Sequence, residues 1–142
     1  MGTIGQRQSS LLAAALAAYP SLTAAAELRI EVAGLRNADG LVFVAVCTED
    51  EFLRPVCTHV GRAPASEGVV TVTGVPPGTY AVQAVHDENG NERLDRLGFL
   101  PIEGMGFSRD APMRMGPPRW GEAAFDLAEP GAVVRLTMRY FQ

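Results

Sequence analysis

GVVTVTGVPPGTYAVQAVHD, residues 68–87, is the stretch that decides the fold class. Valine alternates with threonine in its first half, and Tyr80, Val82 and Ala84 share one face of its second half. A period of two is typical of β-strands with one buried face, and the central PPG is typical of a tight turn. The stretch therefore predicts two strands joined by a turn.

Further strands are expected on both sides of this stretch, over residues 27–35, 41–48, 123–127 and 132–140. Residues 41–48 (LVFVAVCT) are apolar on both faces, which favours a central strand. Half-apolar sheets must bury their apolar faces on each other. We therefore predict an all-β fold, a single antiparallel β-sandwich.

The composition excludes several classes of protein. The chain has 142 residues, enough for one domain, and a formal net charge of −4. No run approaches the 18 apolar residues of a membrane span. All 12 basic residues are arginine and are scattered among 16 acids. Because phosphate binding needs a basic stripe, nucleic acid is not an expected partner, whereas cations are compatible with this charge.

The first 26 residues resemble a signal peptide. Arg7 precedes an apolar run from Leu11 to Tyr19, and the small residues 24–26 (AAA) follow. We expect export to the periplasm or the medium, with cleavage between Ala26 and Glu27. Residues 27–142 then form the β-sandwich domain. The alternative is a buried N-terminal helix, which is less favoured because the run has no polar face.

Cys47 and Cys57 are the two cysteines of the chain. In an exported protein an even number of cysteines suggests a disulfide, which would stabilise the fold by about 2 to 3 kcal/mol. Two free buried thiols are the alternative. A metal site that adds His59 is also conceivable, although the spacing fits no zinc pattern.

The segment from Gly98 to Glu122 is rich in glycine and proline, has no period, and is longer than most loops. Its aromatic residues Phe99, Phe107 and Trp120 argue against disorder, because a solvated linker does not carry them. We expect one long, ordered and packed loop at an end of the sandwich.

A calcium-type pattern immediately precedes this loop, in VHDENGNERLDRLG, residues 85–98. Asp87, Asn89, Asn91 and Asp95 provide side-chain oxygens at the spacing of a calcium loop. A hairpin at Asn89-Gly90 is less favoured, because the residues that follow do not alternate. The four residues are therefore the candidate metal ligands, with calcium as the candidate ion.

Two departures weaken this pattern. Glu92 stands where calcium loops have glycine, and Gly98 stands where they have their final acid. We therefore expect weak binding, at roughly 10⁻⁴ to 10⁻³ M. The alternative without an ion is a set of Asx turns made by the asparagines.

His86 beside Asp87 suggests a hydrolase-type enzyme with an acid–base pair, and Ser108 with Asp110 invites a triad. The motifs G-x-S-x-G and H-E-x-x-H do not occur, and a lone histidine at a strand end is more often structural. We therefore expect that the protein is not an enzyme.

Met105, Met113 and Met115 form a cluster of thioethers that suits Cu(I), with His86 as a possible fourth ligand. Methionine more often fills irregular gaps beneath a loop. Copper binding is therefore the minor alternative.

Three segments carry a resemblance to a known family: residues 75–95 (VPPGTYAVQAVHDENGNERLD), 97–111 (LGFLPIEGMGFSRDA) and 115–127 (MGPPRWGEAAFDL). They resemble exported bacterial proteins of the domain of unknown function 2141 family. The resemblance implies a transthyretin-like or immunoglobulin-like sandwich and no particular activity. Members usually have glycine in place of Glu92, so the bend required for an ion is in question here.

These observations predict an exported, non-catalytic β-sandwich module of the cell envelope, with a binding or structural role. Its weak calcium loop is expected to order the segment from Gly98 to Glu122. That segment is the expected contact surface for an unknown protein or envelope ligand.

Overall fold

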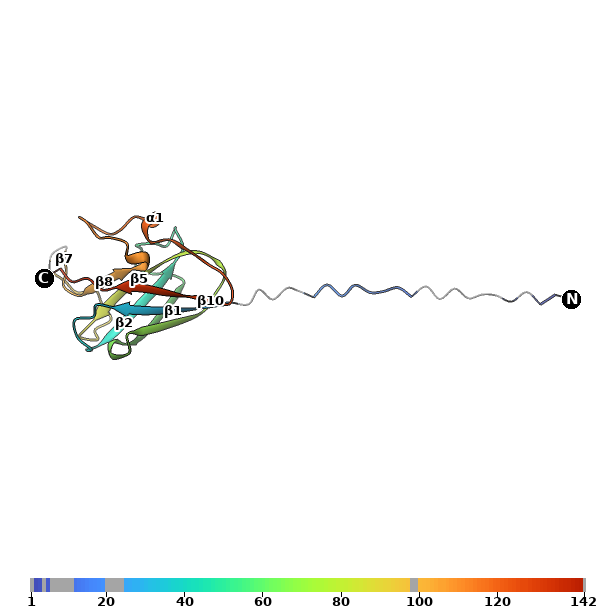
Figure 1. The fold of residues 1–142 in the computed structure, drawn as a ribbon, viewed down its shortest axis with the longest axis horizontal. Coiled ribbons are helices and arrows are strands. Elements are labelled where there is room, and N and C mark those ends of the chain that lie inside the picture. The colour runs from blue at the N-terminus through green and yellow to red at the C-terminus, as the bar shows by residue number, and fades with distance from the viewer. Residues whose placement is uncertain (1, 4, 6–11, 20–24, 98–99, 142) are drawn as a thin grey trace.

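The computed structural model describes residues 2–3, 5, 12–19, 25–97 and 100–141, and its ribbon is drawn in Figure 1. The described residues form ten strands, one short α-helix and two 3₁₀ turns. These are β1 (Ala26–Ala33), β2 (Leu41–Cys47), β3 (His59–Pro64), η1 (Ala65–Glu67), β4 (Val69–Val75), β5 (Gly78–Asp87), β6 (Arg96–Leu97), β7 (Leu100–Pro101), β8 (Gly104–Phe107), η2 (Ser108–Asp110), α1 (Trp120–Ala123), β9 (Phe125–Leu127) and β10 (Gly131–Thr137). The prediction of an all-β fold is confirmed.

The strands form two larger sheets and one small one. The first sheet has the order β10-β1-β4, the second has the order β3-β2-β5-β8 with β9 beside the start of β5, and β6 pairs with β7. β1 and β10 are parallel, whereas every other pair is antiparallel. The prediction of antiparallel strands is therefore wrong for the β1–β10 pair alone among the pairs described. Parallel neighbours need a long connection, and here nearly the whole domain connects them.

The two larger sheets share one buried apolar cluster. β1 contributes Leu28 and Ile30, β5 contributes Val82, and β10 contributes Leu136, each at most 1% exposed. The alternation in the sequence therefore did mark the buried faces. The position of residues 41–48 is also confirmed, because β2 lies between β3 and β5.

β3 is an edge strand that the sequence analysis did not predict. It contains Gly61 and ends at Pro64, and neither residue favours a strand. The glycine is required by packing, because a Cβ on Gly61 would lie 2.9 Å from Cγ2 of Val72. An edge position tolerates such a sequence because only one neighbour must be paired.

The segment from Gly98 to Glu122 is not a single loop. It contains β7, β8, η2 and most of α1, and β8 extends the larger sheet by pairing with β5. Phe107 is 1% exposed, and Phe52 makes edge-to-face contacts with Phe107 and Trp120. The expectation of an ordered, packed segment is thus met, while Phe99 lies outside the described residues.

Two glycines allow β8 to pack closely against β10 and the residues that follow it. A Cβ on Gly104 would lie 2.5 Å from the ring of Tyr140, and one on Gly106 would lie 2.8 Å from Leu136. Met105, between them, faces the opposite side of the sheet. Glycine therefore makes this close approach possible.

The described part of the N-terminal segment packs against neither sheet (Figure 1). Leu12, Leu16 and Tyr19 are at least 85% exposed, and residues 12–19 form no helix, unlike the alternative of a buried helix. β1 begins at Ala26, next to the predicted cleavage position. Cleavage itself stays a prediction. Among the described residues, no helix has the length and apolar character needed to cross a membrane.

Candidate functional site

The candidate calcium loop begins where β5 ends. Asp87 is the last residue of β5 and is 1% exposed. Its Oδ1 accepts a hydrogen bond from the backbone N–H of Asn91 (3.2 Å), and its Oδ2 accepts one from Glu92 (2.7 Å). Since β6 pairs with β7, Asn89 and Gly90 do not join a hairpin to β5. The carboxylate of Asp87 instead folds the loop around itself.

The other three predicted ligands meet at Asp95. Its carboxylate accepts hydrogen bonds from Nδ2 of Asn89 (2.7 Å) and from Nδ2 of Asn91 (2.9 and 3.0 Å). These bonds, those from Asn91 first, lower the pKa of Asp95. The structure therefore brings all four residues into one loop.

The asparagines also form Asx turns, the alternative to a metal loop. Oδ1 of Asn89 accepts from the N–H of Asn91 (3.1 Å), and Oδ1 of Asn91 accepts from the N–H of Arg93 (2.9 Å). In this arrangement Nδ2 of each asparagine, and not Oδ1, faces Asp95, so an ion held with Asp95 would require both amides to reorient.

Glu92 adopts the bend that glycine gives in calcium loops. Its φ is +60°, in the left-handed region that costs an L-residue about 1 to 2 kcal/mol. Its carboxylate points outward and pairs with Arg62 at 2.7 Å, where both side chains are mostly exposed. The substitution of glycine by glutamate thus leaves the required backbone path in place.

Glu103 completes the loop and was missed by the sequence analysis. The β6–β7 hairpin returns the chain to Asp95, whose carbonyl accepts from the N–H of Ile102 (2.9 Å) and whose N–H donates to Oε2 of Glu103 (3.1 Å). The usual spacing of a calcium loop would place the final acid at position 98. Glu103 lies five residues further along the chain, after the β6–β7 hairpin.

The carboxylate of Glu103 is buried and incompletely satisfied. The residue is 4% exposed, and Oε1 has no hydrogen-bond partner among the described residues. Burial, and then the charges of Asp95 and Asp87, raise the pKa of Glu103. A buried polar atom without a partner costs about 1 to 3 kcal/mol. Arg36, whose pKa is raised first by a hydrogen bond to another glutamate and also by the charge of Glu103, donates to the carbonyl of Ile102 and not to Oε1.

The carboxylates of this loop are too few and too dispersed to form a metal site by themselves. In the described part of the chain, no three His, Cys, Asp or Glu side chains are arranged as a metal-binding group. Calcium takes six to eight oxygens, which include amide oxygens, carbonyl oxygens and water. Binding at this loop would therefore require Asn89 and Asn91 to turn their oxygens inward, which favours low affinity.

His86 is a structural residue of the core. It is fully buried, its Nε2 donates to the carbonyl of Asp39 (2.7 Å), and its Nδ1 accepts from the hydroxyl of Tyr140 (2.7 Å). The backbone N–H of Arg36 donates in turn to that hydroxyl (3.2 Å). Both ring nitrogens are occupied, so His86 presents neither an acid nor a base to a cleft.

Ser108 and Asp110 fix η2 to its neighbours. The Ser108 hydroxyl is fully buried, donates to the carbonyl of Ala123 (2.6 Å) and accepts from the N–H of Val82 (2.9 Å). Asp110 accepts from the N–H of Thr137 (2.7 Å). These residues tie the segment to β5 and β10 and do not form a triad with His86.

The three methionines lie along one groove but in different environments. Met105 and Met113 are half-buried against a second apolar cluster, whereas Met115 is fully exposed. Because both nitrogens of His86 are occupied, the proposed fourth copper ligand is not available at this groove. Gap filling accounts for the two packed methionines.

Cys47 and Cys57 form a disulfide, as expected, and both are buried. Glu51 lies within the loop that it closes and accepts hydrogen bonds from the Thr48 N–H (3.0 Å) and from Thr58. The bond from the Thr58 hydroxyl and then that from Thr48 lower the pKa of Glu51 to about 2. This loop is therefore anchored by both a covalent bond and a carboxylate.

Comparison with known proteins gives one match. The model of a family described as "Uncharacterized protein conserved in bacteria (DUF2141)" matches residues 30–135. No curated protein and no solved structure matches the chain. The match covers the β3-β2-β5-β8 sheet, most of the β10-β1-β4 sheet, the candidate calcium loop and Glu103.

Proposed function

The chain belongs to the DUF2141 family of bacterial proteins, and we propose that it is an exported, non-catalytic module of the cell envelope with a weak calcium-binding loop. Its role in this proposal is to bind a partner or to serve a structural purpose in the envelope.

The observation that carries the calcium proposal is Oε1 of Glu103. This atom is buried, has no partner among the described residues, and belongs to a carboxylate that senses the charges of Asp87 and Asp95. A divalent cation would neutralise this cluster and supply the missing contact. Asp87, Asn89, Asn91, Asp95 and Glu103 are the proposed side-chain ligands.

The role proposed for the ion is mechanical. The loop and the β6–β7 hairpin are joined through Asp95 and Glu103, and β8 follows directly. An ion held by both sides would fix the start of the segment from Gly98 to Glu122. The loop would thereby order the surface that we propose as the partner contact.

Export is supported by the N-terminal segment and by the disulfide. Arg7 and the apolar run after it have the composition of a signal peptide. Disulfides such as Cys47–Cys57 persist in oxidising compartments and are rare in the cytosol. The mature exported chain is expected to begin at Glu27, which mass spectrometry of its N-terminal peptide would test.

A non-catalytic role is favoured over the hydrolase alternative by the state of His86. A general base must reach the proton that it removes, and His86 is buried with both nitrogens hydrogen-bonded. Asp87 is likewise committed to the N–H groups of Asn91 and Glu92.

The calcium proposal is tested by thermal unfolding of the full chain with a chelator and with about 10 mM calcium. With a dissociation constant of roughly 10⁻⁴ to 10⁻³ M, calcium adds about 1.4 to 2.7 kcal/mol. Tm is then expected to rise by about 5 to 15 °C. Magnesium is the matched control ion and is expected to act weakly, since it requires a smaller octahedral site.

Two variants decide whether the shift comes from this site. Glu103→Gln keeps an acceptor for the Asp95 N–H and removes the charge, so the calcium shift is expected to vanish. Glu67→Gln, at an exposed position in η1, is expected to keep it. An absent shift in the wild type, or an equal shift in Glu103→Gln, would sink the calcium proposal.

A further inference from the structure

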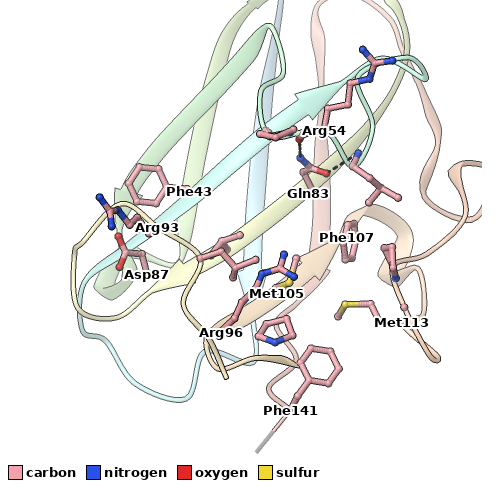
Figure 2. Close-up of a pocket in the computed structure, with 18 of the residues that line it drawn as sticks. Phe43, Arg54, Gln83, Asp87, Arg93, Arg96, Met105, Phe107, Met113 and Phe141 are labelled. Carbon is pink, nitrogen blue, oxygen red and sulfur yellow. Dashed lines mark hydrogen bonds between the residues drawn. The ribbon is translucent and has the colours of Figure 1, made fainter. Parts of the chain in front are cut away.

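The outer face of the β3-β2-β5-β8 sheet is a second apolar surface. On the outward side of these strands, the apolar residues that line it are Phe43, Ala45, Val60, Val85, Met105 and Phe107, and the polar ones are Gln83 and Asp87. Arg62 lies over the ring of Phe43 at one edge, but most of the face is apolar, and an apolar face is normally buried on another layer. Here the described residues form an open groove of about 1110 Å³ above this face (Figure 2).

Two loops and one turn of chain form the walls of the groove. The disulfide-closed loop contributes residues 53–55, the candidate calcium loop contributes residues 92–94 and 96, and residues 113–117 form the third side. Large apolar side chains on these walls and edges are exposed to solvent, among them Leu53, Val60, Leu100, Met115 and Phe141. A contiguous exposed apolar patch of this kind usually marks a binding site.

Three arginines without an ion pair also line the groove. Arg54, Arg93 and Arg96 line it and form no ion pair with any described residue. In Figure 2, Arg54 and Arg93 lie at the rim, and Arg96 reaches across the groove toward Met105. After the hydrogen bonds from the asparagines, the charge of Arg93 also contributes to lowering the pKa of Asp95. Arg54 and Arg96 are therefore the arginines of the groove that remain for a ligand.

The acids at the groove are already engaged. Asp87 is buried and accepts two backbone hydrogen bonds, and Glu92 pairs with Arg62. A ligand therefore meets an apolar floor and free guanidinium groups. Guanidinium binds carboxylate through two parallel hydrogen bonds, and flexible methionine and leucine side chains adapt to an alkyl chain.

We propose that this groove binds a long-chain carboxylate, with the alkyl chain on the outer face of the sheet and the carboxylate held by Arg96. The groove shares Asp87 and the wall of residues 92–94 with the candidate calcium loop, but the proposed contacts to the ligand come from Arg96 and the apolar floor, so binding is expected without the ion. A second copy is the less suitable occupant, because a two-fold contact through this face would bring two sets of unpaired arginines together.

The test is displacement of a fluorescent fatty acid, dansyl-labelled undecanoate, by palmitate from the full chain in the presence of a chelator. Palmitate is expected to bind with one molecule per chain. Hexadecanol, which has the chain without the charge, is expected to bind at least about tenfold more weakly. The chelator makes failure here distinguishable from failure of the calcium proposal.

Paired variants assign the head and the chain of the ligand. Arg96→Gln is expected to weaken palmitate binding about two- to fivefold, as one lost charge pair implies. Arg135→Gln, on the exposed side of β10, is expected to change nothing. Met105→Leu is expected to retain binding, whereas Met105→Glu is expected to abolish it by repelling the carboxylate.

Several outcomes would overturn the proposal: no displacement, equal affinity in Arg96→Gln, or equal binding of hexadecanol. Binding to vesicles of anionic phospholipid without binding of free palmitate would also overturn it, and would indicate a membrane surface. A dimer that masks the groove would indicate a second copy instead. The arginine variants alter exposed side chains, so they keep the test decisive even if Met105→Glu does not fold.

Discussion

The two loops that form opposite walls of the groove are held in different ways. The loop between Cys47 and Cys57 is closed by a covalent bond, and every hydrogen-bonding carboxylate oxygen of Glu51 within it has a partner. The loop from Asp87 to Asp95 is held by side-chain hydrogen bonds, one backbone hydrogen bond from Ile102 and the ion pair of Glu92 with Arg62, and Oε1 of Glu103 beside it has no partner among the described residues. The first wall is therefore fixed by a covalent bond, whereas the second is held by non-covalent contacts.

Removal of the disulfide is the strongest way to break this difference. Cys47→Ala combined with Cys57→Ala is expected to lower the free energy of unfolding by about 2 to 3 kcal/mol, because the unfolded chain regains the entropy of the small loop. Chemical denaturation of both proteins measures this loss. The calcium-dependent shift is expected to survive in the variant, and a loss of both together would contradict the independence of the two walls.

The bend at Glu92 gives a smaller effect in the other wall. Glu92→Gly and Glu92→Ala both remove the exposed pair with Arg62, but only glycine relieves the left-handed backbone at φ +60°. Glu92→Gly is therefore expected to be more stable than Glu92→Ala by about 1 kcal/mol. Equal unfolding free energies of the two variants would show that the bend is not strained.

The smallest expected effect concerns the pH dependence of stability, which has opposite signs for Glu51 and Glu103. Hydrogen bonds lower the pKa of Glu51 to about 2 from 4.5, so its contribution to stability is present above pH 4.5 and is lost as the pH falls toward 2. Burial raises the pKa of Glu103 above 4.5, so its ionised form destabilises the fold as the pH rises past that value.

Tm measured against pH in calcium-free buffer separates the two residues. Relative to Glu51→Gln, the wild type is expected to lose stability on acidification below pH 4.5. Relative to Glu103→Gln, it is expected to lose stability on raising the pH above 4.5. Parallel curves for the wild type and either variant would contradict the assigned environment of that glutamate.

The sequence predicted most of the sheet structure because the buried faces alternate cleanly. β1, β4, β5 and β10 each place apolar side chains at every second position, and β2 is apolar throughout. The second apolar face of β2 was taken only as the sign of a central strand. The structure shows that this face, which carries Phe43 and Ala45, lines the groove.

The strands that were missed lack such alternation for physical reasons. β3 carries Gly61 because β4 approaches it closely, and β8 carries Gly104 and Gly106 because Tyr140 and Leu136 lie against it. Glycine at a close contact removes the apolar signal that periodicity detects. Glu103 was missed for a different reason, since its approach to Asp95 depends on a hairpin of which only two-residue strands are paired.

The Gly104-Met105-Gly106 segment has a consequence for how this protein can vary among its relatives. The two glycines face a crowded contact with the C-terminal residues, so replacement there displaces Tyr140, which holds His86. Met105 faces the groove and is free of that constraint. A change of ligand preference among relatives is therefore expected at the position of Met105, where a new side chain alters the floor of the groove without disturbing the core.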